Sequence, residues 1–140
     1  MEDDKGFIWL PLLEKVWAKL NGNYDRIIMG TVDLGFIHLT GVASQGMKHE
    51  EMRNDTGKTY LWNKIKKAFE NDHIVAAGTQ DDAKDMEEAL SNGLRANHCY
   101  TIVRIYEEKN KTKLLLVRNP WGKNLGTWTG KWSDQDTETW

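Results

Sequence analysis

The sequence has little of what secreted and membrane proteins need. It contains one cysteine, Cys99, so no internal disulfide can form, which favours a reducing compartment. Its longest apolar run, residues 7–13, is too short to span a bilayer. Residues 1–4 include three acidic side chains where a secretion signal would be basic. We therefore expect a cytoplasmic protein without a membrane partner.

Neither charge sign is in excess, and the motifs of nucleotide and zinc sites are missing. With 19 basic and 21 acidic residues the formal net charge is −2, which gives no reason to expect a nucleic-acid partner. There is no Gly-x-Gly-x-x-Gly motif and no phosphate-binding loop. His38, His49 and His73 have no zinc-ligand spacing with one another or with Cys99. The composition indicates one globular domain, or one domain plus a piece of another.

The first third of the chain is predicted to be helical. Apolar residues at helical spacing predict an amphipathic helix over 11–20, which Asn21-Gly22 ends. A weaker helical stretch follows over 24–39, interrupted by glycines and ending at Thr40-Gly41. Residues 44–58 are charged and without hydrophobic period, which predicts a linker or a long surface loop.

The remainder mixes a helix with strands. The pattern predicts a helix over 59–71, a buried strand over 74–78, and two strands over 98–106 and 113–118 joined by a polar turn at 107–111. Residues 81–90 fit either a helix or a loop. Their aspartates lack the ligand spacing of an EF-hand and indicate a solvated acidic face. The tryptophan-rich and glycine-rich stretch over 121–134 predicts a structured loop.

The two long strands bring a histidine and an asparagine together. If they form an antiparallel hairpin about the polar turn, His98 and Asn119 face each other at its open end, with Cβ atoms roughly 4.5–5.5 Å apart. An asparagine beside a histidine is two-thirds of the Cys-His-Asn constellation of papain-like proteases. There the imidazole takes the thiol proton and later protonates the leaving amine, while the asparagine orients the ring. Trp121 would shield the pair from water.

Simpler interpretations remain for each residue. A histidine that opens a strand is often a structural residue with satisfied hydrogen bonds, and Asn-Pro-Trp-Gly after a strand can be a turn capped by its asparagine. Cys99 does not complete the constellation, because adjacent residues on a strand point to opposite faces. With His98 in the active site, Cys99 is expected to point into the core, and this chain offers no nucleophile.

At these residues the chain resembles the protease core of the calpains, intracellular calcium-dependent cysteine endopeptidases. The resemblance runs over nearly the whole chain. It is carried by Trp9-Leu10-Pro11-Leu12-Leu13-Glu14-Lys15, Ala18-Lys19-Leu20-Asn21-Gly22, Leu39-Thr40-Gly41, Asn97-His98-Cys99-Tyr100-Thr101-Ile102, Arg118-Asn119-Pro120-Trp121-Gly122 and Trp128-Thr129-Gly130-Lys131-Trp132-Ser133-Asp134.

The resemblance implies a papain-like α+β fold, a lobe built on antiparallel sheet with flanking helices and truncated at both ends. Residues 1–41 would be the closing helices of the first lobe, which in calpains supplies the nucleophilic cysteine and an oxyanion-hole glutamine. Residues 42–140 would be the second lobe without its last strands. His98 and Asn119 match the catalytic pair, and Trp121 matches the tryptophan beside the cleft.

Three departures from the family pattern bear on the site. Cys99 stands where the family has a small alanine, and Asn97 stands where it has a glycine, a change expected to alter the edge of the cleft. Thr127 replaces an acidic calcium ligand, although Asp134 matches a second one. Calcium is thus implied by the family, and no cofactor is required by the residues themselves.

The sequence therefore predicts the His/Asn part of a calpain-type endopeptidase that acts on polypeptides together with a cysteine-bearing first lobe. That lobe belongs to the same longer chain or to a separate subunit. Alone, the chain is expected to be inactive. The alternatives are a non-catalytic binding or regulatory module (a pseudoprotease), and a truncated gene model that corresponds to no independent protein.

Overall fold

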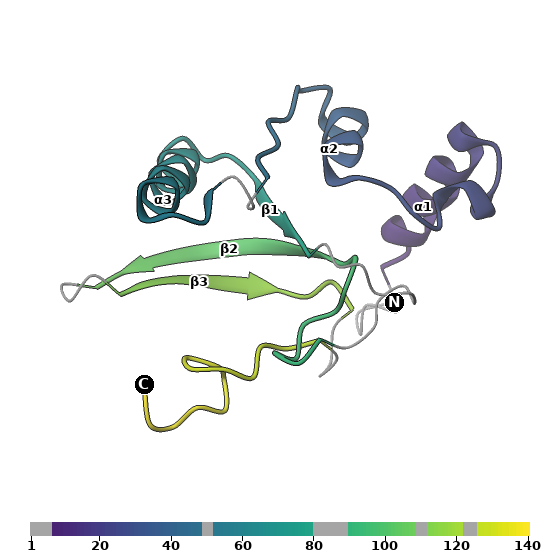
Figure 1. Cartoon of the computed structure of the whole chain (residues 1–140). Coiled ribbons are helices and arrows are strands. Elements are labelled where there is room, and N and C mark those ends of the chain that lie inside the picture. The colour runs from purple at the N-terminus through teal and green to yellow at the C-terminus, as the bar shows by residue number, and fades with distance from the viewer. Residues whose placement is uncertain (1–6, 49–51, 80–89, 109–111, 122–125) are drawn as a thin grey trace. The chain divides into compact units, whose positions relative to one another are not determined.

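The computed structural model describes residues 7–48, 52–79, 90–108, 112–121 and 126–140. These residues form three α-helices, one short 3₁₀ helix and a three-stranded antiparallel sheet, so the fold is α+β as predicted (Figure 1). They fall into two compact units that divide between Gly46 and Met47. Within the described ranges, no helix combines the length and the apolar character of a membrane span. The assignment of 1–41 and 42–140 to two protease lobes stays a prediction.

Helix α1 spans Trp9–Asn21 and confirms the helix predicted over 11–20. It ends at Gly22, whose positive φ of 105° lets its N–H reach back to the carbonyl of Lys19. On this helix Trp17 packs against the ring of His38, with centroids 5.0 Å apart. Several apolar side chains of α1 are more than half exposed; they are Trp9, Leu12, Val16 and Leu20.

The helical stretch predicted over 24–39 is interrupted around Gly30 as predicted, but the interruption predicted at Gly35 is wrong, because that glycine lies inside a helix. A 3₁₀ helix, η1, covers Tyr24–Ile27, and helix α2 covers Val32–Thr40. The helical pattern stops between them at a segment that contains Gly30, a residue that costs a helix about 1 kcal/mol relative to alanine. The predicted end is confirmed: Gly41 has φ 71° and donates its N–H to the carbonyl of Ile37.

Helix α3 spans Asp55–Glu70 and begins one turn before the helix predicted over 59–71. The predicted loop over 44–58 is correspondingly too long. The first turn has no apolar period, but the side-chain oxygen of Asn54 accepts the N–H of Gly57 at 2.7 Å and caps the helix. Capping chemistry, rather than hydrophobic spacing, sets this boundary.

The sheet has the order β1-β2-β3, with both pairs antiparallel. Strand β1 covers Val75–Gly78, β2 covers Cys99–Glu107 and β3 covers Lys113–Arg118, each within one residue of its predicted bounds. The predicted helix or loop over 81–90 lies outside the described residues except for its last position. Most of the predicted turn at 107–111 lies outside them as well.

Two layers flank the sheet within this unit. Figure 1 shows α3 on one side of the sheet and the C-terminal segment on the other. From α3, Lys66 forms a salt bridge of 3.1 Å with Glu107, and its hydrogen bond lowers the pKa of that carboxyl. The ring of Trp62, which is buried, lies 5.5 Å from the Lys113 ammonium. On the opposite side, the Tyr100 hydroxyl donates to the carbonyl of Gly126 at 3.2 Å.

The C-terminal segment is a loop without helix or strand over its described residues, as predicted. The carboxylate of Asp136 organises it. This side chain accepts backbone N–H groups from Trp132 at 2.8 Å, Glu138 at 3.1 Å and Thr139 at 3.2 Å. The indole of Trp140 donates to the carbonyl of Ser133 at 2.8 Å. Hydrogen bonds to one carboxylate thus take the place of regular secondary structure.

The segment should loosen in acid. The N–H of Trp132, with those of Glu138 and Thr139, lowers the pKa of Asp136 below its ordinary value of 3.8. A depressed carboxyl pKa stabilises the fold above the unfolded pKa, and this contribution is lost as the pH falls below 3.8 through the folded pKa. We expect tryptophan fluorescence to report this change in the wild type. Asp136→Asn should already be loosened at neutral pH, whereas the exposed neighbour variant Asp134→Asn should titrate like the wild type.

Candidate active site

The hairpin brings His98 and Asn119 together through a register that differs from the predicted one. Direct opposition of the two residues is wrong, because β2 and β3 pair Thr101 with Arg118. One further step along this register puts Asn119 across from Tyr100. His98 lies two residues before Tyr100 on the same face of the strand. It is therefore the diagonal neighbour of Asn119, at a distance of roughly 7–8 Å that a side-chain ring can bridge.

The turn and a bulge account for the difference in register. The last pair before the turn is Glu107 with Lys113, and the N–H of Glu108 bonds to the carbonyl of Thr112, so the turn lies farther along the chain than predicted. The register then shifts by one residue at Val103. Pattern and turn composition locate a hairpin, but they do not count its bulges.

The predicted contact itself is confirmed. His98 Nε2 lies 2.8 Å from Asn119 Oδ1, and His98 is only 7% exposed. The same Oδ1 accepts the backbone N–H of Trp121 at 3.1 Å, while Asn119 Nδ2 lies 3.5 Å from the Gly126 carbonyl. The hydrogen-bond network therefore assigns the oxygen to the imidazole side, where it can only accept. Nε2 must carry the ring proton, and Nδ1 is the nitrogen that can take one up.

Aromatic rings enclose the imidazole on two sides. The ring centroid of Trp121 is 4.5 Å from that of His98, and the ring of Tyr100 meets it edge-on at 4.9 Å. The guanidinium of Arg95 lies 5.8 Å from the centroid of Trp121, within cation–π range. These rings keep water from the hydrogen bond between His98 and Asn119, and the exclusion of water strengthens that bond. The position of Trp121 is therefore the one that shielding of the pair requires.

Two backbone positions shape the turns around this pair. Asn97 has φ 49°, in the left-handed region that glycine adopts freely and asparagine tolerates better than other residues. The glycine-to-asparagine departure is thus compatible with the backbone. Gly126 has φ 70°, and a Cβ there would lie 2.8 Å from Arg95 Cγ and 3.0 Å from Asn119 Nδ2. Only glycine lets the loop approach the pair this closely.

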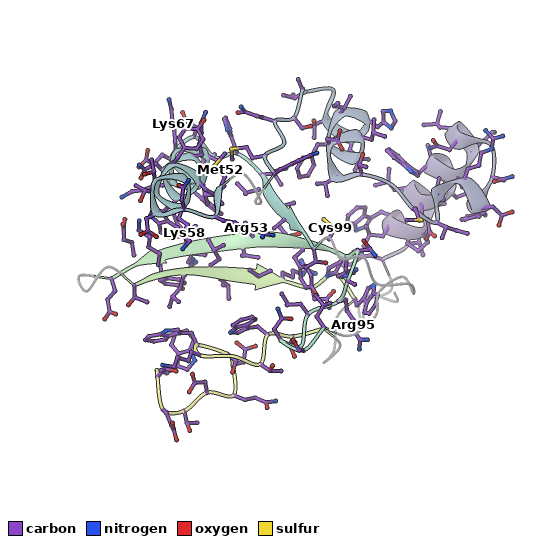
Figure 2. The ribbon with its side chains drawn as sticks, in the orientation of Figure 1. Met52, Arg53, Lys58, Lys67, Arg95 and Cys99 are labelled. Carbon is purple, nitrogen blue, oxygen red and sulfur yellow. The ribbon has the colours of Figure 1, made fainter. Side chains whose placement is uncertain are left out.

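Cys99 is placed at the start of β2, on the same side of that strand as α3 (Figure 2). His98 packs against Tyr100, two residues on, so the two neighbours His98 and Cys99 follow the predicted alternation. The expectation that Cys99 points into the core overestimated its burial, because the residue is only half-buried. Partial burial raises the pKa of its thiol, the opposite of what a nucleophile needs.

The described residues do not assemble a calcium site around Asp134. Calcium takes six to eight oxygen ligands, and no three acidic, histidine or cysteine side chains gather to hold a metal within the described ranges. Asp134 is exposed, and the nearby carboxylate of Asp136 is committed to backbone N–H groups. Calcium binding stays a prediction from the resemblance, and we derive no chemical step through it.

Sequence reasoning missed four residues that hold the pair in place: Thr79, Arg95, Tyr100 and Gly126. Tyr100 could have been found, since strand alternation puts it on the same face as His98. The other three have no local pattern. They come from separate turns, and only the tertiary fold brings them to the site.

Comparison with known proteins identifies a family over the full chain and relatives over most of it. A family model described as calpain family cysteine protease matches residues 1–140. The chain is 33% identical over 133 residues to Calpain clp-1 of Caenorhabditis elegans, covering 93% of this chain and 16% of that protein. It is 31% identical over 137 residues to human Calpain-14, covering 96% and 18%.

A plant relative has a similar identity to the chain, but the match covers a smaller share of that relative's length. Over 133 residues the chain is 29% identical to the calpain-type cysteine protease DEK1 of Zea mays, covering 94% of this chain and 6% of the maize protein. The chain thus spans between 6% and 18% of the length of these relatives.

Proposed function

Because the chain belongs to the calpain family of cysteine proteases, we propose that it supplies the histidine and asparagine of a thiol endopeptidase active site. The observation that carries the proposal is the 2.8 Å contact between His98 Nε2 and an Asn119 oxygen that the N–H of Trp121 also holds. The nucleophile would be a cysteine on a first lobe, in the same longer chain or in a separate subunit.

In the proposed mechanism His98 moves the protons. Its Nδ1 accepts the proton of the cysteine thiol, which leaves a thiolate to attack the peptide carbonyl. The imidazolium keeps its Nε2–H on Asn119 Oδ1, so the positive charge stays oriented and partly compensated. Nδ1 then returns its proton to the leaving amine, and hydrolysis of the thioester frees the cysteine.

Asn119 and Trp121 would act by fixing that geometry. Asn119 selects the tautomer with the proton on Nε2, because its Oδ1 accepts and cannot donate. Trp121 lies over the imidazole at 4.5 Å and keeps water from the bond that holds the ring. An orienting hydrogen bond in a water-poor site contributes to catalysis by pre-organisation rather than by chemistry of its own.

The wider setting of the protease is part of the proposal. A single cysteine fits a reducing compartment, which supports action in the cytoplasm. We propose calcium dependence for the assembled protease by its family, and we assign no complete ligand set within the described residues of this chain.

The second candidate is a non-catalytic binding or regulatory module. The exposed apolar side chains of α1, such as Leu12 and Val16 at 53% each, favour association with a partner. A stable complex with a cysteine-bearing first lobe fits both proposals, and light scattering supports this candidate only where the complex is with a protease subunit that already carries its own cysteine, histidine and asparagine. A monodisperse monomer that binds no hydrophobic dye counts against it.

The proposed function is tested by restoring the missing lobe. We expect the purified chain alone to leave a fluorogenic peptide uncleaved, because its one thiol lies on the strand face away from His98. A fusion that adds, before this chain, the cysteine-bearing part of a calpain relative's first lobe should hydrolyse the peptide. Cleavage by the chain alone that is lost in His98→Ala, or a folded but inert fusion, would contradict the proposal.

A further inference from the structure

Thr79 follows β1 directly and contacts the backbone of His98 from both directions. Its N–H donates to the His98 carbonyl at 2.9 Å, and its Oγ1 accepts the His98 N–H at 3.1 Å. In a continued antiparallel ladder a main-chain carbonyl would accept that N–H. Here the strand is interrupted by Asn97 at φ 49°, and a side-chain hydroxyl replaces the main-chain partner.

The same hydroxyl reaches a second segment. A threonine hydroxyl has one proton to donate, and the carbonyl of Arg95 is its nearest acceptor, ahead of the His98 carbonyl at 3.1 Å. The Arg95 guanidinium lies 5.8 Å from the ring centroid of Trp121, and Trp121 lies over the imidazole. The Thr79 hydroxyl thus connects the backbone of His98 to the backbone of Arg95. Arg95 is also the residue whose guanidinium lies against Trp121, the ring beside the imidazole.

We propose that Thr79 is a positioning residue, whose hydroxyl holds the His98 imidazole against Asn119. Thr79 lies 19 residues before His98, and its hydrogen bonds to that residue are to the main chain. Its effect passes through the His98 main chain, because the ring must bridge a diagonal between strands to reach Asn119, and a small displacement of the backbone breaks the 2.8 Å bond. The importance of Thr79 for catalysis rests on the proposed function, whereas the experiment that tests its effect on the imidazole does not.

The test measures the ring proton of His98 in the whole chain. A hydrogen-bonded Nε2–H exchanges slowly with water and is visible by nitrogen-15 NMR, whereas a released ring exchanges quickly. Thr79→Val keeps the shape and removes the hydroxyl, and we expect it to accelerate ring-proton exchange about tenfold, the equivalent of one lost hydrogen bond. Thr79→Ser restores the hydroxyl and should retain slow exchange. Thr101→Val, on exposed β2 surface, is the matched control.

The backbone amide of Ile102, which is buried in β2, separates positioning from folding. Faster ring exchange in Thr79→Val with an unchanged Ile102 amide supports the proposal. Equal acceleration of both protons, or unfolding of the variant, overturns it, because Thr79 then serves only stability. Unchanged ring exchange in a folded Thr79→Val overturns it too. No substrate or nucleophile is involved, so this result is independent of the activity of the fusion.

Discussion

Replacing His98 by alanine in the fusion with a cysteine-bearing lobe should reduce kcat/KM for a fluorogenic peptide by at least about 10³-fold. The imidazole is the only group in the described site with a nitrogen placed to exchange protons, and its Nε2 is fixed by Asn119 at 2.8 Å. Without it the thiol stays protonated at neutral pH, and the leaving amine has no proton donor.

The control for this variant is another histidine of the same chain. His73 follows α3 and is exposed, so His73→Ala should leave kcat/KM within about twofold of the wild type. Asn119→Ala should fall between these two, because the ring remains but its tautomer and orientation are released. Retention of most activity by a folded His98→Ala fusion would overturn the assignment of the general base.

Replacing Gly93 by alanine should destabilise the chain by about 3 kcal/mol. Gly93 has φ 85°, and a Cβ there would lie 2.1 Å from the carbonyl oxygen of Thr127 and 2.7 Å from Thr129 Cγ2. The first contact is with backbone, so no side-chain rotation relieves it. The turn at Gly93 would have to move away from the loop that contains Thr127 and Thr129. In the wild type a hydrogen bond of 3.0 Å, from the N–H of Thr129 to the carbonyl of Asn92, holds the turn and this loop together.

Denaturant unfolding measures this effect, with Gly78→Ala as the matched control. Gly78 ends β1, its φ is outside the positive region, and among the residues that the structure describes a Cβ there would meet only the His98 carbonyl, at 4.0 Å. Its replacement should change the free energy of unfolding by no more than about 0.5 kcal/mol. Similar midpoints for Gly93→Ala and Gly78→Ala would show that the turn and the Thr127 loop do not pack as described.

The same loop also connects stability to the site. Gly126, next to Thr127, accepts hydrogen bonds from Tyr100 and Asn119 through its carbonyl. A turn that is forced away at Gly93 therefore disturbs the residues that anchor the asparagine. We expect the ring proton of His98 to lose its protection in Gly93→Ala before the buried amide of Ile102 does.

The sequence by itself determined the elements and the chemical pair. Hydrophobic spacing is a local property, so it located α1, β2 and β3, and two strands around one polar turn brought His98 and Asn119 within reach of each other. The glycines at 22 and 41 ended their helices where predicted, because a cap residue with positive φ is a local requirement as well.

Only the tertiary structure decided how the pair is held. The register depended on a turn position and on a bulge at Val103, neither of which has a hydrophobic signature. Thr79, Arg95 and Gly126 act through hydroxyl, guanidinium and carbonyl groups whose partners lie 7 to 26 residues away in the chain. Such contacts leave no local period in the sequence, because they satisfy hydrogen bonds between separate turns. The chemistry of the site is therefore encoded locally, and its precision is set by the packing of distant segments.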